Sequence, residues 1–381
     1  MNAERRGHSW RKSSGLWPAA LLLGLVGDRG ESARAQDATA SPGVVVPPEG
    51  IRSPPTAGAS GAMILGREPL GVAAMGTPSR YGSATRPTYG NFFDVALASI
   101  FGPSDYAPYR PLSLRTLFTE GWDEPWIAEP NDSGDAQQGW INAADGNFYR
   151  LYFFSYTFTN HLSQGGNGNT GAYTLYTPLS RRLELITSIP FITSQPTFGV
   201  GKQQFPNQGT TPRSTGHPTS AGFGDITFTP RVMLFDNDKL AISTQMSIQA
   251  PTGYRRVGAG QTILTPGAQF WWNFAENWVM RGGFNAGVGT NRQAGGTTLL
   301  SQYALGRTFT AHEVPVFGDL TFYLSTNIFN TVSSSQTTVT LTPGFRTHLG
   351  KDWYLLGGID VPVTGRRPFE EGAIFWFMKT Y

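Results

Sequence analysis

Residues 225–249, DITFTPRVMLFDNDKLAISTQMSIQ, contain two alternating runs separated by the turn-forming residues 236–239. In the first run, apolar side chains occupy every second position from Ile226 to Leu234, and Thr227, Thr229 and Arg231 stand between the first four of them. In the second run, Ser and Gln fill alternate positions from Ser243 to Gln249. Successive side chains of a strand point to opposite faces, so the two faces of this predicted hairpin meet different environments.

The same alternation recurs along residues 147–381, where one face of each clear segment is apolar. Its members include Tyr152, Phe154, Tyr156 and Phe158; Ala268, Phe270, Trp272 and Phe274; Trp278, Met280, Phe284 and Val288; and Trp353, Leu355, Ile359 and Val361. Polar residues such as Gln269 and Asn285 lie between them. A soluble sandwich would turn the apolar face toward a second sheet, whereas a membrane barrel turns it toward lipid and encloses the polar face.

The predicted connections alternate in length, which favours the barrel. Short turns fall at residues 179–182, 236–239, 275–277, 310–316 and 350–352. Longer polar loops fall at about residues 160–170, 190–224, 251–262, 290–297, 330–336 and 364–372. Five turns and six loops join twelve strands, and an even number with short periplasmic turns is the plan of outer-membrane proteins. We predict an all-β fold, a transmembrane antiparallel up-and-down β-barrel of about 12 strands.

Aromatic residues gather near the short turns, as is typical of a membrane interface. They are Trp271, Trp272, Trp278, Trp353 and Tyr354, with Trp376 near the C-terminus. The final residues 373–381, AIFWFMKTY, resemble the terminal assembly signal of outer-membrane barrels. We therefore expect outer-membrane lipid and the barrel assembly machinery as partners.

Three prolines, Pro230, Pro266 and Pro343, fall within predicted strands as part of a repeated Thr-Pro motif. Proline cannot donate a hydrogen bond to a strand ladder. We therefore expect β-bulges at these positions.

The composition excludes several classes of protein. The first 35 residues contain six basic and three acidic residues, which leaves 23 of each sign in the remaining 346, so the formal charge of +3 gives no support for nucleic-acid binding. Charged residues make up 14% of the chain, against about 25% in soluble proteins. No apolar run after residue 35 approaches the ~20 residues of a spanning helix. The absence of Cys excludes thiolate metal sites and Cys nucleophiles.

The N-terminal third divides into three predicted parts. Residues 1–35 are a signal peptide, with four basic residues before a short apolar core and small residues at Ala33 and Ala35 for cleavage. Residues 36–88 are a disordered tether rich in Pro, Gly and Ser. Residues 89–146, with a short helix predicted over residues 91–100, form a periplasmic cap or a plug; an arm that only packs is the alternative. Residues 147–381 form the barrel.

Three motifs carry a family resemblance: residues 180–191 (SRRLELITSIPF), residues 222–231 (GFGDITFTPR) and residues 247–253 (SIQAPTG). These motifs resemble those of the outer-membrane transporter family linked to the meta-pathway of phenol degradation. Members of that family share a strand that starts R-L-E-L and ends I-P, a G-x-G-D strand opening and a closing P-T-G. The resemblance covers about residue 173 to the C-terminus. It implies an outer-membrane barrel that passes small, often aromatic or hydrophobic, compounds.

Charged residues on the predicted inner face gather in the periplasmic half. They are Glu184, Arg231, Arg281, Asp319 and Arg346, with Arg307 included if the parity of its strand matches. One interpretation is a lumen constriction that selects solutes by charge and hydrogen bonding. The other is a set of ion pairs that fills a modest barrel, which the mixture of signs favours.

A second group of residues is expected at the outer mouth, where solutes would arrive. Its members are Asp225, Gln249, Arg255, Arg256 and Asp360. A solvated rim without a role in selection is the alternative interpretation.

The expected function is passive passage of small molecules across the bacterial outer membrane, with small-molecule solutes as partners and without catalysis, cofactor or metal. One alternative is a barrel-embedded lipid hydrolase, because His161 and Ser163 resemble the His-x-Ser arrangement of outer-membrane phospholipase A. The Ser-Asn-Gly continuation of that motif is absent. The other alternative is a non-conducting barrel with a structural or surface-binding role. Residues 236–238 fit an ordinary turn better than a Ca²⁺ site.

Overall fold

The computed structural model describes residues 89–103, 109–128, 139–161, 167–195, 198–199, 213–214, 220–254, 258–290, 297–332, 336–364 and 367–381. They all belong to the compact unit Val72–Tyr381. The predicted signal peptide and tether lie outside the described residues, as do Ser163, Arg255 and Arg256.

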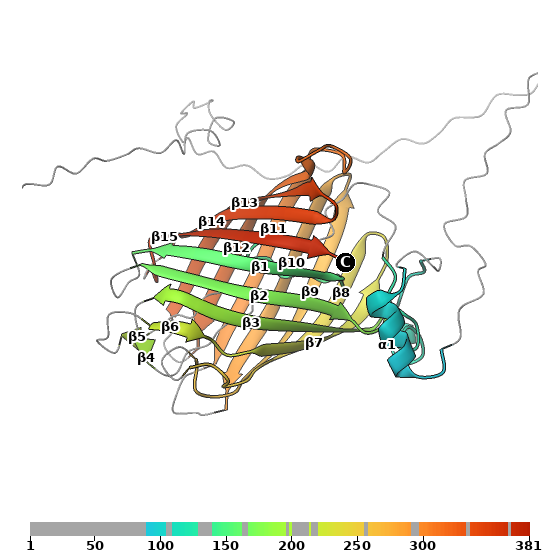
Figure 1. The fold of residues 1–381 in the computed structure, drawn as a ribbon, viewed down its shortest axis with the longest axis horizontal. Coiled ribbons are helices and arrows are strands. Elements are labelled where there is room, and N and C mark those ends of the chain that lie inside the picture. The colour runs from blue at the N-terminus through green and yellow to red at the C-terminus, as the bar shows by residue number, and fades with distance from the viewer. Residues whose placement is uncertain are drawn as a thin grey trace, which may run out of the picture. The chain divides into compact units, whose positions relative to one another are not determined.

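Antiparallel strands curve into a barrel (Figure 1). They are β1 (Leu151–Asn160), β2 (Gly168–Pro178), β3 (Leu183–Gln195), β6 (Ser220–Phe223), β7 (Thr227–Asp236), β8 (Leu240–Gln249), β9 (Ile263–Ala275), β10 (Trp278–Gly289), β11 (Thr298–Thr308), β12 (Gly318–Thr331), β13 (Gln336–Gly350), β14 (Trp353–Pro362) and β15 (Glu371–Thr380). β1 pairs with both β2 and β15, and β2 pairs with β3, so the sheet closes on itself. β6 and β7 pair with successive parts of β3 and therefore occupy one strand position in the wall. Counted in this way, the described barrel has 12 strands. A separate pair, β4 (Phe198–Gly199) and β5 (Arg213–Ser214), belongs to the connection between β3 and β6.

The connections confirm the predicted plan. Short turns join β2 to β3, β7 to β8, β9 to β10, β11 to β12 and β13 to β14, and the C-terminus lies at the same end of the barrel (Figure 1). Asn277, Lys351 and Asp352 have positive φ angles in two of these turns. Asn and Asp tolerate that conformation better than most residues, which is why such short connections are accessible to this sequence.

The barrel exposes apolar side chains and buries polar ones. Phe284 on β10 and Leu324 on β12 are 46% and 47% exposed, whereas Arg281 and Thr342 are fully buried. The buried inward side chains also include Thr229, Ser243, Gln245, Ser247, Asn285, Gln302 and Asn327. A soluble protein shows the opposite distribution, and only lipid favours an outer surface built of Phe and Leu rows. The chain is an outer-membrane β-barrel.

The aromatic residues divide between the two faces. Trp353 stacks on Phe377 with ring centroids 4.4 Å apart, and Tyr152 lies 6.1 Å from Trp353, across the neighbouring strands β1, β15 and β14. These rings face outward, as predicted for the interface. Trp271, Tyr354 and Trp376 are buried inside the barrel instead. The prediction was wrong for these three because each is one position out of phase with the outward-facing row.

The strand prolines do not produce bulges. Pro230, Pro266 and Pro343 lie opposite Leu185, Met246 and Leu324 in unbroken stretches of register. Register shifts lie elsewhere, as between Met233 and Phe235 beside the β7–β8 turn. The prediction of bulges at the prolines is therefore wrong. The register shifts of the sheet lie near strand ends instead.

The predicted helix is present as α1 (Phe92–Phe101). The Asn91 side chain caps its first turn by accepting a hydrogen bond from the Asp94 amide at 3.0 Å, and Gly102 closes its last turn. A short 3₁₀ helix, η1 (Leu114–Thr116), follows. Among the described residues, every helix is too short or too polar to cross a bilayer.

Leu324→Arg tests the orientation of the barrel wall. Leu324 lies on the outer face beside Leu305, and a lipid-facing Arg near the midplane costs about 2–4 kcal/mol of folding free energy. The matched control is Val314→Arg in the β11–β12 turn, which is expected to change stability little. Urea titration of folding into phospholipid vesicles measures both variants. Equal losses would contradict a lipid-facing Leu324.

Candidate functional site

An extended segment runs through the inside of the barrel. Residues 139–150, GWINAADGNFYR, precede β1, and every residue from Trp140 to Arg150 is buried. We call residues 139–150 the lumen segment. Barrel strands had been expected from Asn147 onward, but β1 begins at Leu151. The four residues before it belong to the lumen segment, because the Asn147 carbonyl and the Tyr149 amide bond to the inward side chains of Arg231 and Glu184.

Side chains of the wall satisfy the backbone of the lumen segment. Ser325 donates to the Ile141 carbonyl at 2.8 Å, and the Ile141 amide donates to the Tyr323 hydroxyl at 3.1 Å. The Asp145 amide donates to Gln269 at 3.0 Å. These partners come from β12 and β9, so the segment is held by scattered side chains and not by a strand ladder.

Glycines make room for the lumen segment. A Cβ on Gly146 would lie 2.4 Å from the Ala241 carbonyl oxygen and 2.7 Å from the Trp271 amide nitrogen, both backbone atoms of the wall. Within the wall, a Cβ on Gly283 would lie 2.8 Å from the Ala144 Cβ, and one on Gly306 would lie 2.6 Å from the Trp140 ring. The segment and the wall therefore fit without space for additional atoms at these points.

Arg231 and Glu184 form the first charged pair of the lumen. The Arg231 Nη1 atom lies 2.6 Å from Glu184 Oε2, and both side chains are buried. Arg231 also donates to Ser243 and to the carbonyl oxygens of Asp145 and Asn147. Glu184 accepts a hydrogen bond from the Tyr149 amide at 2.7 Å. One ion pair of the wall thus holds three residues of the lumen segment.

Asp145 and Arg281 form the second pair, between the segment and β10. Asp145 also accepts a hydrogen bond from the Tyr149 hydroxyl at 2.6 Å. Burial raises the pKa of the Asp145 carboxyl, while the charges of Arg281 and Arg231 and the Tyr149 hydrogen bond oppose that rise. The Arg281 guanidinium also lies over the Trp140 ring at 4.3 Å. It therefore contacts both a carboxylate and an aromatic face of the segment.

Arg346 and Asp319 lie together near the β11–β12 turn. Their closest charged atoms are 3.7 Å apart, and the Arg346 guanidinium lies 4.5 Å from the centre of the Tyr354 ring. His312 contacts Asp319 at 2.8 Å and stacks on His348. Five of the six expected constriction residues, Glu184, Arg231, Arg281, Asp319 and Arg346, are therefore buried on the inner side of the barrel.

Arg307 is the exception and does not belong to the lumen. It is exposed, and its guanidinium lies between the rings of Trp278 and Phe309 at 5.6 and 5.3 Å. On β11 the inward positions are even-numbered near this end, including Ala304 and Thr308, so Arg307 points outward. Arg307 was expected in the constriction only if its strand directed it inward. It points outward, so it does not belong to the candidate site.

The described residues of the expected outer mouth are buried in local contacts. Asp225 lies between β6 and β7 and accepts hydrogen bonds from Gln249 and from the amides of Gly253 and Ala259. Asp360 accepts one from Thr342 at 2.8 Å. Through these contacts, Asp225 anchors the β8–β9 connection. That the outer-mouth residues contact solutes stays a prediction.

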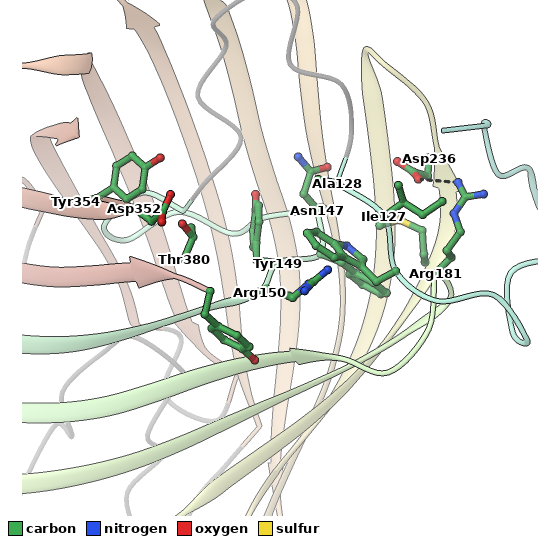
Figure 2. Close-up of a pocket in the computed structure, with 14 residues that line it drawn as sticks. Ile127, Ala128, Asn147, Tyr149, Arg150, Arg181, Asp236, Asp352, Tyr354 and Thr380 are labelled. Carbon is green, nitrogen blue, oxygen red and sulfur yellow. Dashed lines mark ion pairs between the residues drawn. The ribbon is translucent and has the colours of Figure 1, made fainter. Parts of the chain in front are cut away.

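Two hollows adjoin the lumen segment. The larger, about 400 Å³, is lined by Asn147, Phe148 and Tyr149 together with Arg181 and Asp236 at the short-turn end. Figure 2 shows Tyr149 beside this hollow and the ion pair of Arg181 with Asp236 at its far side. The smaller, about 50 Å³, lies deeper among residues 143–145 and inward side chains such as Thr229 and Gln245. It has room for a few water molecules only, so the segment occupies most of the lumen at this depth.

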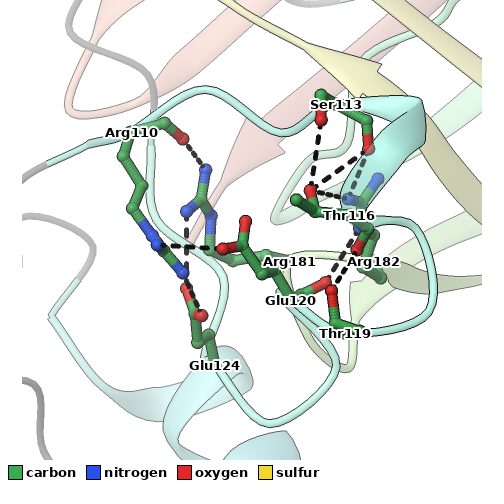
Figure 3. Close-up of polar contacts among 8 residues, drawn as sticks. All are labelled: Arg110, Ser113, Thr116, Thr119, Glu120, Glu124, Arg181 and Arg182. Carbon is green, nitrogen blue, oxygen red and sulfur yellow. Dashed lines mark hydrogen bonds and ion pairs between the residues drawn. The ribbon is translucent and has the colours of Figure 1, made fainter.

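Residues 109–128, which we call the arm, dock on the short turns. Leu112 exchanges two backbone hydrogen bonds with Asp236, at 2.8 and 3.0 Å. Arg182 donates to the carbonyl oxygens of Glu120 and Ser113 at 3.0 and 2.9 Å. Figure 3 shows this network and the second one, in which Glu124 contacts Arg110 and Arg181. The arm thereby fixes the chain just before it turns into the barrel.

Sequence reasoning missed three residues of this site, namely Trp140, Asp145 and Tyr149. The segment that carries them lacks alternation, and Ala-Ala-Asp-Gly is typical of a turn. A signal that could have located the segment lies in the wall. Gly283 and Gly306 occupy inward positions without a side chain, and this leaves room for Ala144 and Trp140 of the segment.

The hydrolase alternative gains no support from the described residues. His161 has a positive φ angle and its imidazole lies 3.0 Å from Glu370 at the outer end of the barrel. Ser163 lies outside the described residues. In the described part of the chain, no three His, Cys, Asp or Glu side chains are grouped to hold a metal ion.

A family model described as "Putative MetA-pathway of phenol degradation" matches residues 146–378. An outer membrane channel from Pseudomonas putida F1 is similar at 12% identity and a TM-score of 0.44, with 67% of this chain and 100% of that chain covered. The KdgM porin is similar at 8% identity and a TM-score of 0.41, with 61% and 99% covered. The beta domain of the Bordetella autotransporter Brka has 10% identity and a TM-score of 0.39, with 62% and 100% covered. No curated protein matches the sequence. At these values, nothing that the three solved proteins bind is transferred to this chain.

Gly146→Ala tests the fit of the lumen segment. The added methyl group would meet backbone atoms of β8 and β9, so we expect the segment to leave its position while the barrel stays closed. Hydrogen–deuterium exchange of the peptide covering residues 139–150 should rise, and exchange of the strands should not. Gly139→Ala is the matched control, because its nearest contact would be 3.9 Å away. Equal exchange in the two variants would contradict the tight fit.

Proposed function

We propose that this chain, which belongs to the family described as "Putative MetA-pathway of phenol degradation", is a passive outer-membrane channel that opens when the lumen segment is displaced. The observation that carries the proposal is the way the segment is held. Its hydrogen bonds with the described wall run through side chains such as Ser325, Gln269 and Arg231. Side-chain hydrogen bonds contribute about 1 kcal/mol each and break singly.

The barrel does not depend on the lumen segment for closure. β1 and β15 pair along their full lengths, and every other neighbouring pair of strands has its own ladder. Removal of residues 139–150 from the interior would therefore leave each strand paired on both sides. A displaceable plug inside an independently closed barrel is the arrangement that a gated pore requires.

Once the segment is displaced, the wall would line the pore. Its charged band would consist of Glu184, Arg231, Arg281, Asp319 and Arg346, which we propose as the constriction. Inward aromatic rings lie near this band, including Trp271 and Tyr323. Such rings offer apolar contact to small aromatic or hydrophobic solutes, the class that the family resemblance implies. No catalytic step, cofactor or metal is part of this function.

The second candidate is a non-conducting barrel with a structural or surface-binding role. The occupied lumen favours it, since residues 140–150 are buried and the hollow beside residues 143–145 is about 50 Å³. The two candidates differ in whether ions cross the membrane through the protein.

Planar-bilayer recording separates the two candidates. We expect the wild-type protein to show brief, infrequent conductance steps and Gly146→Ala to stay open for a larger fraction of the time, because the altered segment no longer fits. Gly139→Ala should behave as the wild type. Absence of steps from the wild type and from Gly146→Ala, both correctly folded, would reject the channel and favour the filled structural barrel.

A further inference from the structure

The lumen segment presents an aromatic ring and a carboxylate to one arginine. The Trp140 ring stacks on Tyr323 with centroids 5.1 Å apart and planes 1° apart, and the Arg281 guanidinium lies 4.3 Å from the centre of the same ring. The Asp145 carboxylate forms an ion pair with the same guanidinium. These are the two groups that an aryl carboxylate carries in one molecule.

The ring is held by its faces alone. The Trp140 indole nitrogen is buried and makes no hydrogen bond with any described residue. A ring without an N–H group would therefore fill the same place between Tyr323 and Arg281 without losing a hydrogen bond. Stacking and cation–π contact act through the ring face and need no N–H donor.

The charge next to Asp145 also favours an anion. Around the segment, the described wall contributes Arg231, Arg281 and Arg346 together with Glu184, Asp319 and Asp360. Glu184 pairs with Arg231, Asp319 lies beside Arg346, and Asp360 accepts a hydrogen bond from Thr342. Asp145 of the segment is the carboxylate that pairs with Arg281. A cation in its place would meet the Arg281 guanidinium, whereas an anion would take over the part that Asp145 plays.

We propose that Arg281 and Tyr323 form a binding site for aryl carboxylates, which Trp140 and Asp145 occupy while the lumen segment is in place. The site rests on the proposed function and names its solute class. Withdrawal of Asp145 alone removes a negative charge from beside a buried guanidinium, which is strongly unfavourable. A solute carboxylate that enters as Asp145 leaves keeps that charge compensated. Aryl carboxylates therefore promote displacement of the segment, and neutral or cationic aromatics do not.

Cysteine labelling measures displacement directly, because the chain contains no Cys of its own. Ala143→Cys places one thiol on the buried lumen segment of the full-length protein, beside the small hollow that Ala143 lines, where a membrane-impermeant methanethiosulfonate reagent reaches it only after displacement. Benzoate should raise the labelling rate about tenfold, the effect of one charge-assisted hydrogen bond. Benzyl alcohol and benzylamine, which share the ring, should leave the rate unchanged.

Three further variants locate the effect. Arg281→Gln in the same background should abolish acceleration by benzoate, whereas Arg307→Gln, a matched arginine on the outer face, should preserve it. Asp145→Asn should label rapidly without benzoate and gain nothing from it, which tests the same pair if Arg281→Gln does not fold. Heat-modifiable migration on gels verifies that each barrel is folded.

The outcomes separate this site from the channel. Equal labelling with benzoate, benzyl alcohol and benzylamine would overturn the carboxylate site even if the barrel conducts. Acceleration by benzoate that survives Arg281→Gln in a folded barrel would overturn it as well. Benzoate-dependent labelling of a barrel that never conducts would support the site and reject the channel.

Discussion

Lipid offers no hydrogen-bond partner to a backbone amide or carbonyl, so each strand of this sheet must pair on both sides. The pairing of β1 with β15 meets that requirement, from Leu151 opposite Thr380 to Asn160 opposite Glu371. Closure gives every strand one face toward lipid and one toward the lumen, and alternation then assigns each side chain to a face. The rows of Phe and Leu outside, and the buried Arg, Glu, Ser and Gln inside, follow from this single constraint.

Charged groups buried inside a closed barrel need partners. Wall and lumen segment meet that need jointly. Glu184 pairs with Arg231 and also accepts a hydrogen bond from the Tyr149 amide, and Arg281 pairs with Asp145. The contacts that neutralise the wall are therefore the contacts that hold the segment. In the proposed channel, a solute that competes for these charges would also compete with the segment, which would couple occupancy of the site to opening.

Alternation was sufficient to predict the barrel, its turns and the lipid-facing rows, because period and parity are local properties of a strand. It was also sufficient for Arg231 and Arg281, whose strands begin with clear phase. It left Arg307 open, because the phase at that strand end was ambiguous. The aromatic clustering failed for Trp271, which is one position out of phase with the outward-facing Trp272. It gave no information on Asp145, since a segment held by distant side chains has no period of its own. Such a segment is specified by the wall, where Gly283 and Gly306 leave room for it.

The energetics of the lumen segment lie near balance. At least eight hydrogen bonds to the wall, counted among the described residues, contribute about 8 kcal/mol. Burial of Trp140, Ile141 and Phe148 contributes about 6 kcal/mol, while ordering the backbone of residues 139–150 costs about 12–24 kcal/mol. The gain therefore lies within the range of the cost. In the proposed channel, a small energetic change, such as the exchange of one buried carboxylate for another at Arg281, would therefore be sufficient to decide whether the segment stays.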